Sequence, residues 1–348
     1  MREVVVVGAG AHGSAVAWHL ARRGHDVLLL DRFEPGHRFG SSHGSSRIFR
    51  LSHADPADIA SARDALVLWR ELEAESGLDI LDRVGSMEIG PPAALEPIVG
   101  VLEATGVAYE RLDAGEAARR WTTFAFRGHD EVLFQPDGGR LHADNAVAAF
   151  QACAVAHGAE ARFSERVLAI LPTGTGVHVE TEATDERAAC VVVAAGAWVT
   201  DLAGGLVDLP PLRVTQEQVF HFAGPEDLPG FLWDDYYGVV SPGEGVKVGE
   251  HGTGPVVHPD RRDGLVDGAG KARVLDFVRT RLPGLEPVPH SETTCLYTTA
   301  PDDRQVFATA DGVVAFSACS GMGFKFAPTI GRHVADLALA AVPARRQA

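Results

Sequence analysis

Apolar and polar positions at the start of the chain predict a βαβ unit. The unbroken β-branched run over residues 4–7 is typical of a parallel strand covered on both faces, and a glycine-rich segment over residues 8–13 follows it directly. A helix is expected next, ended by Gly24. Its apolar face carries Ala15, Val16, Leu20 and Ala21. The apolar run over residues 26–31 then predicts a second strand.

The same kind of pattern predicts the remaining elements. Asp55 and Pro56 are typical of a helix start, and apolar residues recur at helical spacing from there to Gly77. Further helices are expected over 143–157, near 272–282 and from about Pro328. Buried strands are expected over 190–198 and 312–316. Short strands and turns are expected over 84–139 and 212–299, and helices interrupt the strands of 84–139. The strand over 190–198 is expected to return to the sheet of residues 4–7, and the strand over 312–316 to lead into the last helix.

The α/β segments alternate with the β-rich segments, which predicts two interleaved domains. We expect a fold of the α/β and α+β class, with a Rossmann-like dinucleotide-binding domain and a β-rich substrate domain. The first would comprise residues 1–83, 140–210 and 300–348, and the second 84–139 and 211–299. An active site is expected between them.

The glycine-rich segment predicts a dinucleotide-binding turn. Gly8 would permit the tight turn, Gly10 would let the backbone approach a pyrophosphate, and Gly13 would let helix and strand pack closely. The helix N-terminus adds partial positive charge for the phosphates. Asp31, 18 residues beyond Gly13, ends the second strand where a ribose hydroxyl would lie. FAD and NAD(P) share this phosphate geometry, so the motif leaves the choice between them open, and an ordinary glycine-rich turn is the alternative.

Charge and cysteine content narrow the class of protein. The chain has 31 Lys and Arg against 47 Asp and Glu, a net charge of −16, which argues against nucleic acid or an anionic membrane as the main partner. Four cysteines without a Cys-x-x-Cys spacing predict neither a disulfide framework nor a metal site. No apolar run reaches about 18 residues, and the N-terminus does not have the pattern of a signal peptide. We therefore expect a cytoplasmic protein.

Four segments in order along nearly the whole chain resemble the monomeric sarcosine oxidase family, which includes N-methyltryptophan oxidase, within the D-amino-acid-oxidase group. They are residues 42–50 (SHGSSRIFR), 245–251 (GVKVGEH), 295–298 (CLYT) and 321–326 (GMGFKF). The resemblance implies a monomeric FAD enzyme. It also implies that the enzyme oxidises a C–N bond of an amino acid with a free carboxylate and reduces O2 to hydrogen peroxide.

The resemblance also assigns cofactor residues. Cys295 matches the cysteine that the family joins to the 8α-methyl carbon of the flavin as a thioether, whereas a lone cysteine is otherwise most often a small buried apolar residue. Cys153, Cys190 and Cys319 have no such match and are interpreted as packing. The other candidate cofactor residues around the glycine motif and the two later segments are Arg32, Ser41, His43, Arg47, Gly321, Gly323 and Lys325.

Catalytic roles follow in the same way. Arg50 and Lys325 match the pair that holds the substrate carboxylate, a sensible chemistry because a guanidinium grips a carboxylate bidentately and an ammonium adds a second charge. Lys247 matches the oxygen-activating lysine, and an unpaired lysine in such an apolar strand would be costly. The residues expected to line the substrate pocket are Tyr237, His251 and Tyr297.

The chain departs from the family beside the substrate pocket. It is shorter than usual, and the segment over residues 237–247 is one residue tighter and lacks the usual Phe-Pro after Tyr-Gly. The substrate therefore stays open between sarcosine and bulkier N-methyl aromatic, cyclic or fructosyl amino acids. Two other classes stay open as well, an NAD(P)-dependent dehydrogenase and a flavoprotein without turnover. The colour of the purified protein and its peroxide production would separate them.

Overall fold

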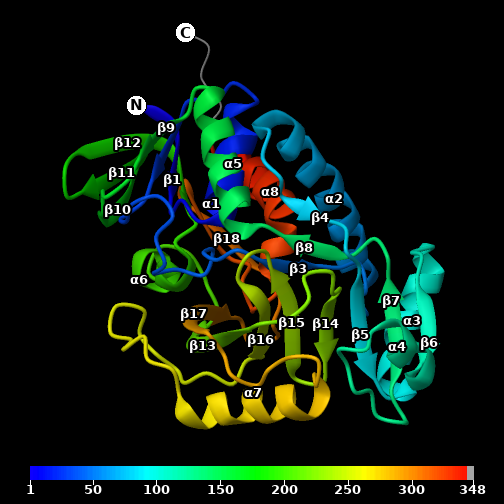
Figure 1. Cartoon of the computed structure of the whole chain (residues 1–348). Coiled ribbons are helices and arrows are strands. Elements are labelled where there is room, and N and C mark those ends of the chain that lie inside the picture. The colour runs from blue at the N-terminus through cyan, green and yellow to red at the C-terminus, as the bar shows by residue number, and fades with distance from the viewer. Residues whose placement is uncertain (343–348) are drawn as a thin grey trace.

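The computed structural model describes residues 1–342 and contains two large sheets with helices on their outer sides (Figure 1). In the first sheet β1, β2, β9, β12 and β19 run parallel, and β10, β11 and β18 extend it with antiparallel pairs. The bounds are β1 (Arg2–Val7), β2 (Val27–Leu30), β9 (Glu160–Arg162), β10 (Val167–Thr173), β11 (Gly176–Thr181), β12 (Asp185–Val193), β18 (Val306–Ala310) and β19 (Val313–Ser317).

Helices cover the first sheet closely. Those packed together on one side are α1 (Ala11–Ala21), α2 (Pro56–Ser76), α5 (Ala143–Ala156) and α8 (Ala327–Ala341). Small residues allow α1 and α8 to approach, because a Cβ on Gly331 would lie 2.6 Å from the Cβ of Ala15. Asp55 caps α2 by accepting a hydrogen bond from the backbone N of Ala57, and Gly77 ends that helix in the left-handed conformation.

The second sheet has eight strands in the order β17-β13-β16-β15-β14-β5-β7-β6. Their bounds are β5 (Ser86–Gly90), β6 (Glu110–Asp113), β7 (Glu131–Gln135), β13 (Arg213–Phe222), β14 (Gly230–Trp233), β15 (Tyr236–Ser241), β16 (Gly245–Glu250) and β17 (Ser291–Thr299). Helix α7 (Gly268–Arg281) packs on it, and the Phe277 ring stacks on that of Tyr236 at 4.1 Å. Helices α3 (Pro92–Thr105) and α4 (Ala114–Arg120) flank the β5-β7-β6 end.

A small three-stranded sheet links the two large ones. It consists of β3 (Arg47–Phe49), β8 (Gly139–Leu141) and β4 (Leu81–Asp82), with β8 in the middle. Gly139 allows β8 to lie close to β4, because a Cβ at this position would lie 1.9 Å from the carbonyl O of Asp82. The strand β3 leads directly into Arg50, so this junction places Arg50 between the large sheets.

Most predicted elements are present, with two corrections. The strand expected over 190–198 ends at Val193, and the chain continues into the short helices η1 (Gly196–Trp198) and α6 (Val199–Ala203). Gly196 has φ +52°, a turn that ends the extended conformation. The helix expected near 272–282 begins earlier, at Gly268, because Asp267 caps it. Apart from the linking sheet, the strands sort between the two large sheets along the predicted segments. The division into two domains stays a prediction.

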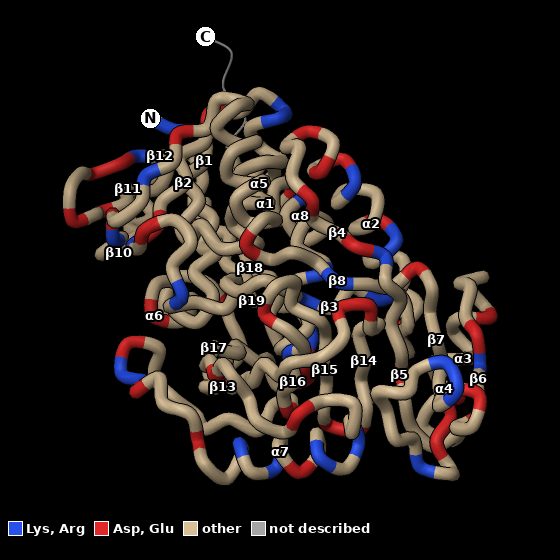
Figure 2. The backbone as a smooth tube through the Cα atoms, in the orientation of Figure 1, with Lys and Arg blue, Asp and Glu red and all other residues tan. Residues whose placement is uncertain are grey.

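Acidic and basic residues alternate over the outer helices (Figure 2). Among residues 1–342, no helix combines the length and the apolar character needed to cross a membrane. The same residues contain no cluster of three or more His, Cys, Asp or Glu side chains arranged to hold a metal ion.

Candidate functional site

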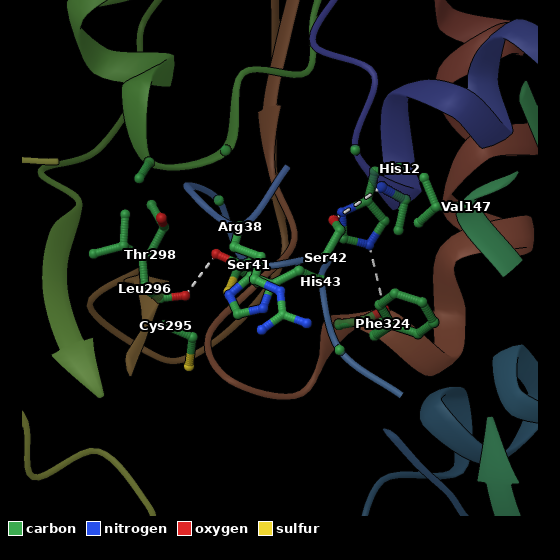
Figure 3. Close-up of a pocket in the computed structure, with 18 of the residues that line it drawn as sticks. His12, Arg38, Ser41, Ser42, His43, Val147, Cys295, Leu296, Thr298 and Phe324 are labelled. Atoms are coloured by element: carbon green, nitrogen blue, oxygen red, sulfur yellow. Dashed lines mark hydrogen bonds between the residues drawn. The ribbon is translucent and has the colours of Figure 1, made fainter. Parts of the chain in front are cut away.

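A cavity of about 1010 Å³ lies between the two large sheets. The carboxyl ends of β1, β2, β12 and β19 form one wall, which is where ligands bind in open parallel sheets. Strands β13, β15, β16 and β17 of the second sheet form another wall. Figure 3 shows Cys295, Leu296 and Thr298 on one side of this space and His12 and Val147 on the other.

The glycine turn leaves no room for side chains. Gly8 has φ +105°, and a Cβ there would lie 2.5 Å from the carbonyl O of Ala194. A Cβ on Gly13 would lie 1.8 Å from the carbonyl O of Gly8, so only glycine lets the helix begin so close to the strand. Gly10, which caps α1, would bring a Cβ to 3.0 Å from the Oγ of Ser42. The turn therefore presents bare backbone to the cavity at the N-terminus of α1.

Asp31 and Arg32 both line the cavity but are held differently. The Asp31 carboxylate accepts a hydrogen bond from the backbone N of Ala9 at 2.7 Å, which ties the end of β2 to the glycine turn. The Arg32 guanidinium pairs with Asp260 at 2.9 Å, and Asp260 also accepts a hydrogen bond from the Trp198 indole at 2.7 Å. Arg32 thus ties the loop that carries Asp260 to this end of the cavity.

The loop over residues 41–47, which follows β2, is held by hydrogen bonds between the Arg47 side chain and the backbone of the same loop. Arg47 donates to the carbonyl oxygens of Ser41, His43 and Ser46, each at 2.7 or 2.8 Å. The Ser41 hydroxyl donates to the carbonyl O of Leu296 at 2.6 Å, which joins this segment to β17. His43 is buried and its Nε2 has no hydrogen-bond partner within residues 1–342. An unpaired buried polar atom beside a cavity is what a site for a polar ligand requires.

Cys295 lines the cavity from β17, directly opposite Glu217 on β13. Burial raises the pKa of its thiol to about 11, although nearby Arg47 and Lys247 act in the opposite direction. Cys153 in α5 and Cys190 in β12 lie away from the cavity, in the core. Cys190 lies inside its strand rather than at the strand start.

Lys247 lies in the middle of β16 with only 6% of its surface exposed. Its ammonium lines the cavity and donates to the carbonyl O of Ser46. Burial first, and then the charge of Arg47, lower the pKa of Lys247 well below its ordinary value. A cation in this position is ready to interact with any negative charge that forms inside the cavity.

Arg50 and Lys325 reach the cavity from β3 and from the short helix η2 (Gly323–Phe326). The Lys325 ammonium donates to the carbonyl O of Met322 at 2.8 Å and lies 4.5 Å from the centre of the Phe326 ring. Burial, and then the charge of Arg50, lower the pKa of Lys325 well below its ordinary value. The chain thus brings two basic side chains together although 275 positions separate them.

Two tyrosines and a histidine stand on the same wall as Cys295. The rings of His251 and Tyr297 are 5.4 Å apart, and burial raises the pKa of both Tyr237 and Tyr297, so their phenols stay protonated. Gly321 has φ +69°, and a Cβ there would lie 2.4 Å from the Tyr297 ring. Gly323 lines the cavity, and a Cβ there would lie 1.5 Å from the carbonyl O of Ala318.

Sequence reasoning missed two residues near these groups. Cys319, interpreted as packing, lines the cavity and is close enough to Cys295 to influence its pKa. Its position just before the segment over residues 321–326 was the available signal. Glu88 forms a buried ion pair with Arg50 at 3.0 Å. Nothing in the local sequence of β5 indicates that partner, which is 38 positions away.

The fold and the cavity define a dinucleotide-binding enzyme with two facing sheets. The glycine turn at the N-terminus of α1, the tethered Asp31 and the unpaired His43 Nε2 fit a nucleotide cofactor. The chain belongs to the FAD-dependent oxidoreductase family, whose model matches residues 3–337.

Its relatives are similar over nearly their whole length. The monomeric sarcosine oxidase of Streptomyces avermitilis is 33% identical over 97% of this chain and 93% of that protein. The N-methyl-L-tryptophan oxidase of Salmonella agona is 28% identical over 98% and 95%. The structure of NikD, described as an unusual amino acid oxidase essential for nikkomycin biosynthesis, has a TM-score of 0.86 at 29% identity and covers 99% of this chain and 95% of that chain.

These comparisons confirm four predictions made from the sequence. The family is confirmed, as are the fold class, FAD as the cofactor and the assignment to FAD-dependent amine oxidases. FAD is therefore the answer to the choice that the glycine motif left open between FAD and NAD(P).

Proposed function

We propose that this protein oxidises the C–N bond of a secondary amine, specifically an N-substituted amino acid with a free carboxylate. The substrate loses two electrons and two protons and becomes an imine, and O2 takes them up to become hydrogen peroxide. Water then hydrolyses the imine. The observation that carries the proposal is that Lys247, Cys295, Arg50 and Lys325 line one cavity together with the glycine turn.

The chain's own residues are proposed to bind and orient both partners. The glycine turn, Asp31, Ser41, His43 and Arg47 would hold FAD, which when bound takes electrons from the amine and passes them to oxygen. Arg50 and Lys325 bind the substrate carboxylate, because a guanidinium and an ammonium together provide directional donors and charge. Their positive charge also favours loss of the amine proton, which the reaction requires.

Further roles are proposed for the opposite wall. Lys247 stabilises the negative charge that oxygen acquires when it takes up electrons. Tyr237, Tyr297 and His251 shape the space for the amine, with the protonated phenols acting as hydrogen-bond donors. Gly321 keeps this wall open, since any side chain there would displace the Tyr297 ring.

A peroxide-coupled screen tests the proposal. Purified protein should produce hydrogen peroxide with at least one N-methyl, cyclic or fructosyl amino acid, and should do so poorly with the same amine lacking its carboxylate. Arg50→Ala should weaken substrate binding by roughly 2–5 kcal/mol, because one partner of a buried charge pair is removed. Equal turnover of an amino acid and its decarboxylated analogue would contradict the carboxylate assignment, and absence of peroxide with every amine would favour a flavoprotein without turnover.

We also propose a covalent bond between the flavin and Cys295. Its support is the position of Cys295 on the cavity wall, facing the same space as the segment held by Arg47. After acid precipitation the yellow colour should stay with the protein, whereas Cys295→Ala should release free flavin or yield protein without it. Cys319→Ala is the matched control, because it removes another thiol from the same cavity. Free flavin in the supernatant of the unmodified protein would refute the bond.

Two properties of the whole protein belong to the same proposal. We propose that it acts as a monomer, on its similarity to proteins named monomeric sarcosine oxidase. We propose the cytoplasm as its compartment, because all four cysteines are free. Sedimentation analysis of the purified protein would test the first point.

A further inference from the structure

A buried carboxylate stands behind the proposed carboxylate-binding pair. Glu88 lies in β5 with 7% of its surface exposed, and its Oε1 accepts hydrogen bonds from the Nη1 of Arg50 at 3.0 Å and the hydroxyl of Ser52 at 2.8 Å. The carbonyl O of Ser52 accepts a second hydrogen bond from the same Nη1. Arg50 lines the cavity, whereas Glu88 does not.

These hydrogen bonds use only the Nη1 atom of the Arg50 guanidinium. Within the described chain, residues 1–342, the Nη2 and Nε atoms of Arg50 make no hydrogen bond to protein. Guanidinium groups bind carboxylates through two parallel N–H donors, so the remaining edge can still hold a carboxylate in this way. Glu88 therefore orients Arg50 without occupying the donors that a substrate needs.

The charges of this cluster sum to one positive charge. Arg50 is always protonated. Burial raises the pKa of Glu88 and lowers that of Lys325, and each lies in the field of the other. The ion pair with Arg50 and the hydrogen bond from Ser52 favour the carboxylate form of Glu88. With Lys325 protonated as well, the three groups carry a net charge of +1.

Two further titratable groups lie beside this cluster. Burial and the charge of Arg50 lower the pKa of His53, so its ring stays neutral. Asp58, 3.8 Å from the His53 ring, acts to raise the pKa of Lys325, which favours the charged form of that lysine. The side chain of Asp58 is 45% exposed, so solvent screens its charge more than that of the buried Glu88.

We infer that Glu88 is a positioning residue that makes the pocket selective for substrates with a single carboxylate. One carboxylate neutralises the cluster, whereas a second anionic group beside it would lack a countercharge and would be repelled by Glu88. The inference rests on the proposed function and narrows its substrate class to N-substituted amino acids without a second carboxylate near the first.

The test compares two acids of similar size on the flavin-containing protein. Propionate and malonate are titrated, and their dissociation constants are measured from changes in flavin absorbance. The unmodified protein should bind propionate more tightly than malonate. In Glu88→Gln the ratio of the two constants should shift toward malonate by about tenfold or more, because one charge a few ångströms from a bound anion changes binding by at least that factor in a protein interior.

Two further variants separate charge from packing. Glu88→Asp keeps the charge and should keep the selectivity for propionate, even if both acids bind less tightly. Glu96→Gln removes the same charge from an exposed pair with Arg111 and should leave the ratio unchanged. A loss of selectivity in Glu88→Asp equal to that in Glu88→Gln would show that the shape of Glu88 matters and not its charge, and would overturn the inference.

The remaining outcomes also decide the question. An unchanged ratio in Glu88→Gln, with normal propionate binding, overturns the inference and leaves the proposed function intact. If Glu88→Gln does not fold or retain flavin, tighter binding of malonate than of propionate by the unmodified protein still overturns it. Unmodified protein that binds neither acid contradicts the carboxylate substrate itself, and the inference fails with it.

Discussion

Lys247 is a buried lysine in the middle of a strand. Among nearby charges, Arg47 has the largest effect on its pKa and lowers it, while Glu244 and Asp144 act in the opposite direction. Burying a lysine costs stability, which favours a chemical role over a structural one.

Replacing Lys247 should slow the oxidative half of the reaction, in which oxygen takes up the electrons. Lys247→Met keeps the length of the side chain and removes the charge, so reoxidation of the reduced protein by oxygen should slow about 10²-fold or more, as when a stabilising donor is removed. Anaerobic reduction by substrate should change much less. Stopped-flow mixing measures both steps, and Lys271→Met, an exposed lysine paired with Glu292, is the control. A normal rate of reoxidation would mean that Lys247 is structural.

The same residue predicts a pH dependence. The pKa of Lys247 lies well below its ordinary value of 10.5, and only the protonated form carries the charge. The rate of reoxidation should therefore be highest at low pH and should fall as pH rises through the lowered pKa. Measurement of that rate over a wide pH range below 10.5 checks the direction, and Lys247→Met should lose the dependence. A rate that increases with pH in the unmodified protein would contradict this role.

At the level of single residues, the sequence predicted those whose signal is local. A lysine within an apolar strand and a cysteine before Leu-Tyr can be recognised where they stand. Glu88 could not be predicted, because a glutamate in a strand is most often on the solvent face and its partner Arg50 approaches only through the small linking sheet. Cys319 was misjudged for a related reason, since the turn that directs it to the cavity depends on the Gly321 conformation.

Among the elements, the glycine turn between β1 and α1 leaves little room for a side chain. Gly13 is enclosed by backbone atoms, and the carbonyl O of Gly8 cannot move without breaking the end of β1. Elements whose signals are local, such as α2 with its Asp55 cap, were predictable to within a residue or two. The end of β12 was not, because small apolar residues fit a strand and the η1 turn equally well.

A pair of glycine substitutions compares the crowded glycine turn with an open position on a helix. Gly13→Ala should abolish flavin retention and destabilise the protein strongly, because the new Cβ would lie 1.8 Å from the carbonyl O of Gly8. Gly100→Ala in α3 has no neighbour within 4 Å and should be tolerated or stabilising by up to about 1 kcal/mol. Denaturant unfolding and flavin content measure both effects. Retention of flavin in Gly13→Ala would mean that the turn can adjust.

For the whole molecule, the cavity lies between the two large sheets, and the proposed cofactor would occupy it. The alternation of α/β and β-rich segments predicted which strands belong to which large sheet. How the sheets face each other could not be predicted, because contacts such as Ser41 with Leu296 join residues 255 positions apart.

The cofactor should therefore stabilise the whole chain. Flavin-free Cys295→Ala protein should unfold at a lower temperature than the flavin-containing protein, and free FAD at about 100 times its dissociation constant should restore roughly 2.7 kcal/mol of stability. Thermal unfolding with and without added FAD measures this. Equal unfolding temperatures would mean that the two sheets hold together without the cofactor.

The packing of α1 against α8 has a consequence for the order in which the chain can fold during its synthesis. The glycine turn leaves the ribosome among the first residues, but β12, β17, β19 and the helix packed on α1 through Gly331 are made much later. The central strand β1 lies between β2 and β12, so it gains its second neighbour only when residues 185–193 have been made. A nascent chain that stops before residue 313 has no β19, no Lys325 and no α8. If the proposed site holds the flavin, we expect the flavin to be loaded only after translation is almost complete.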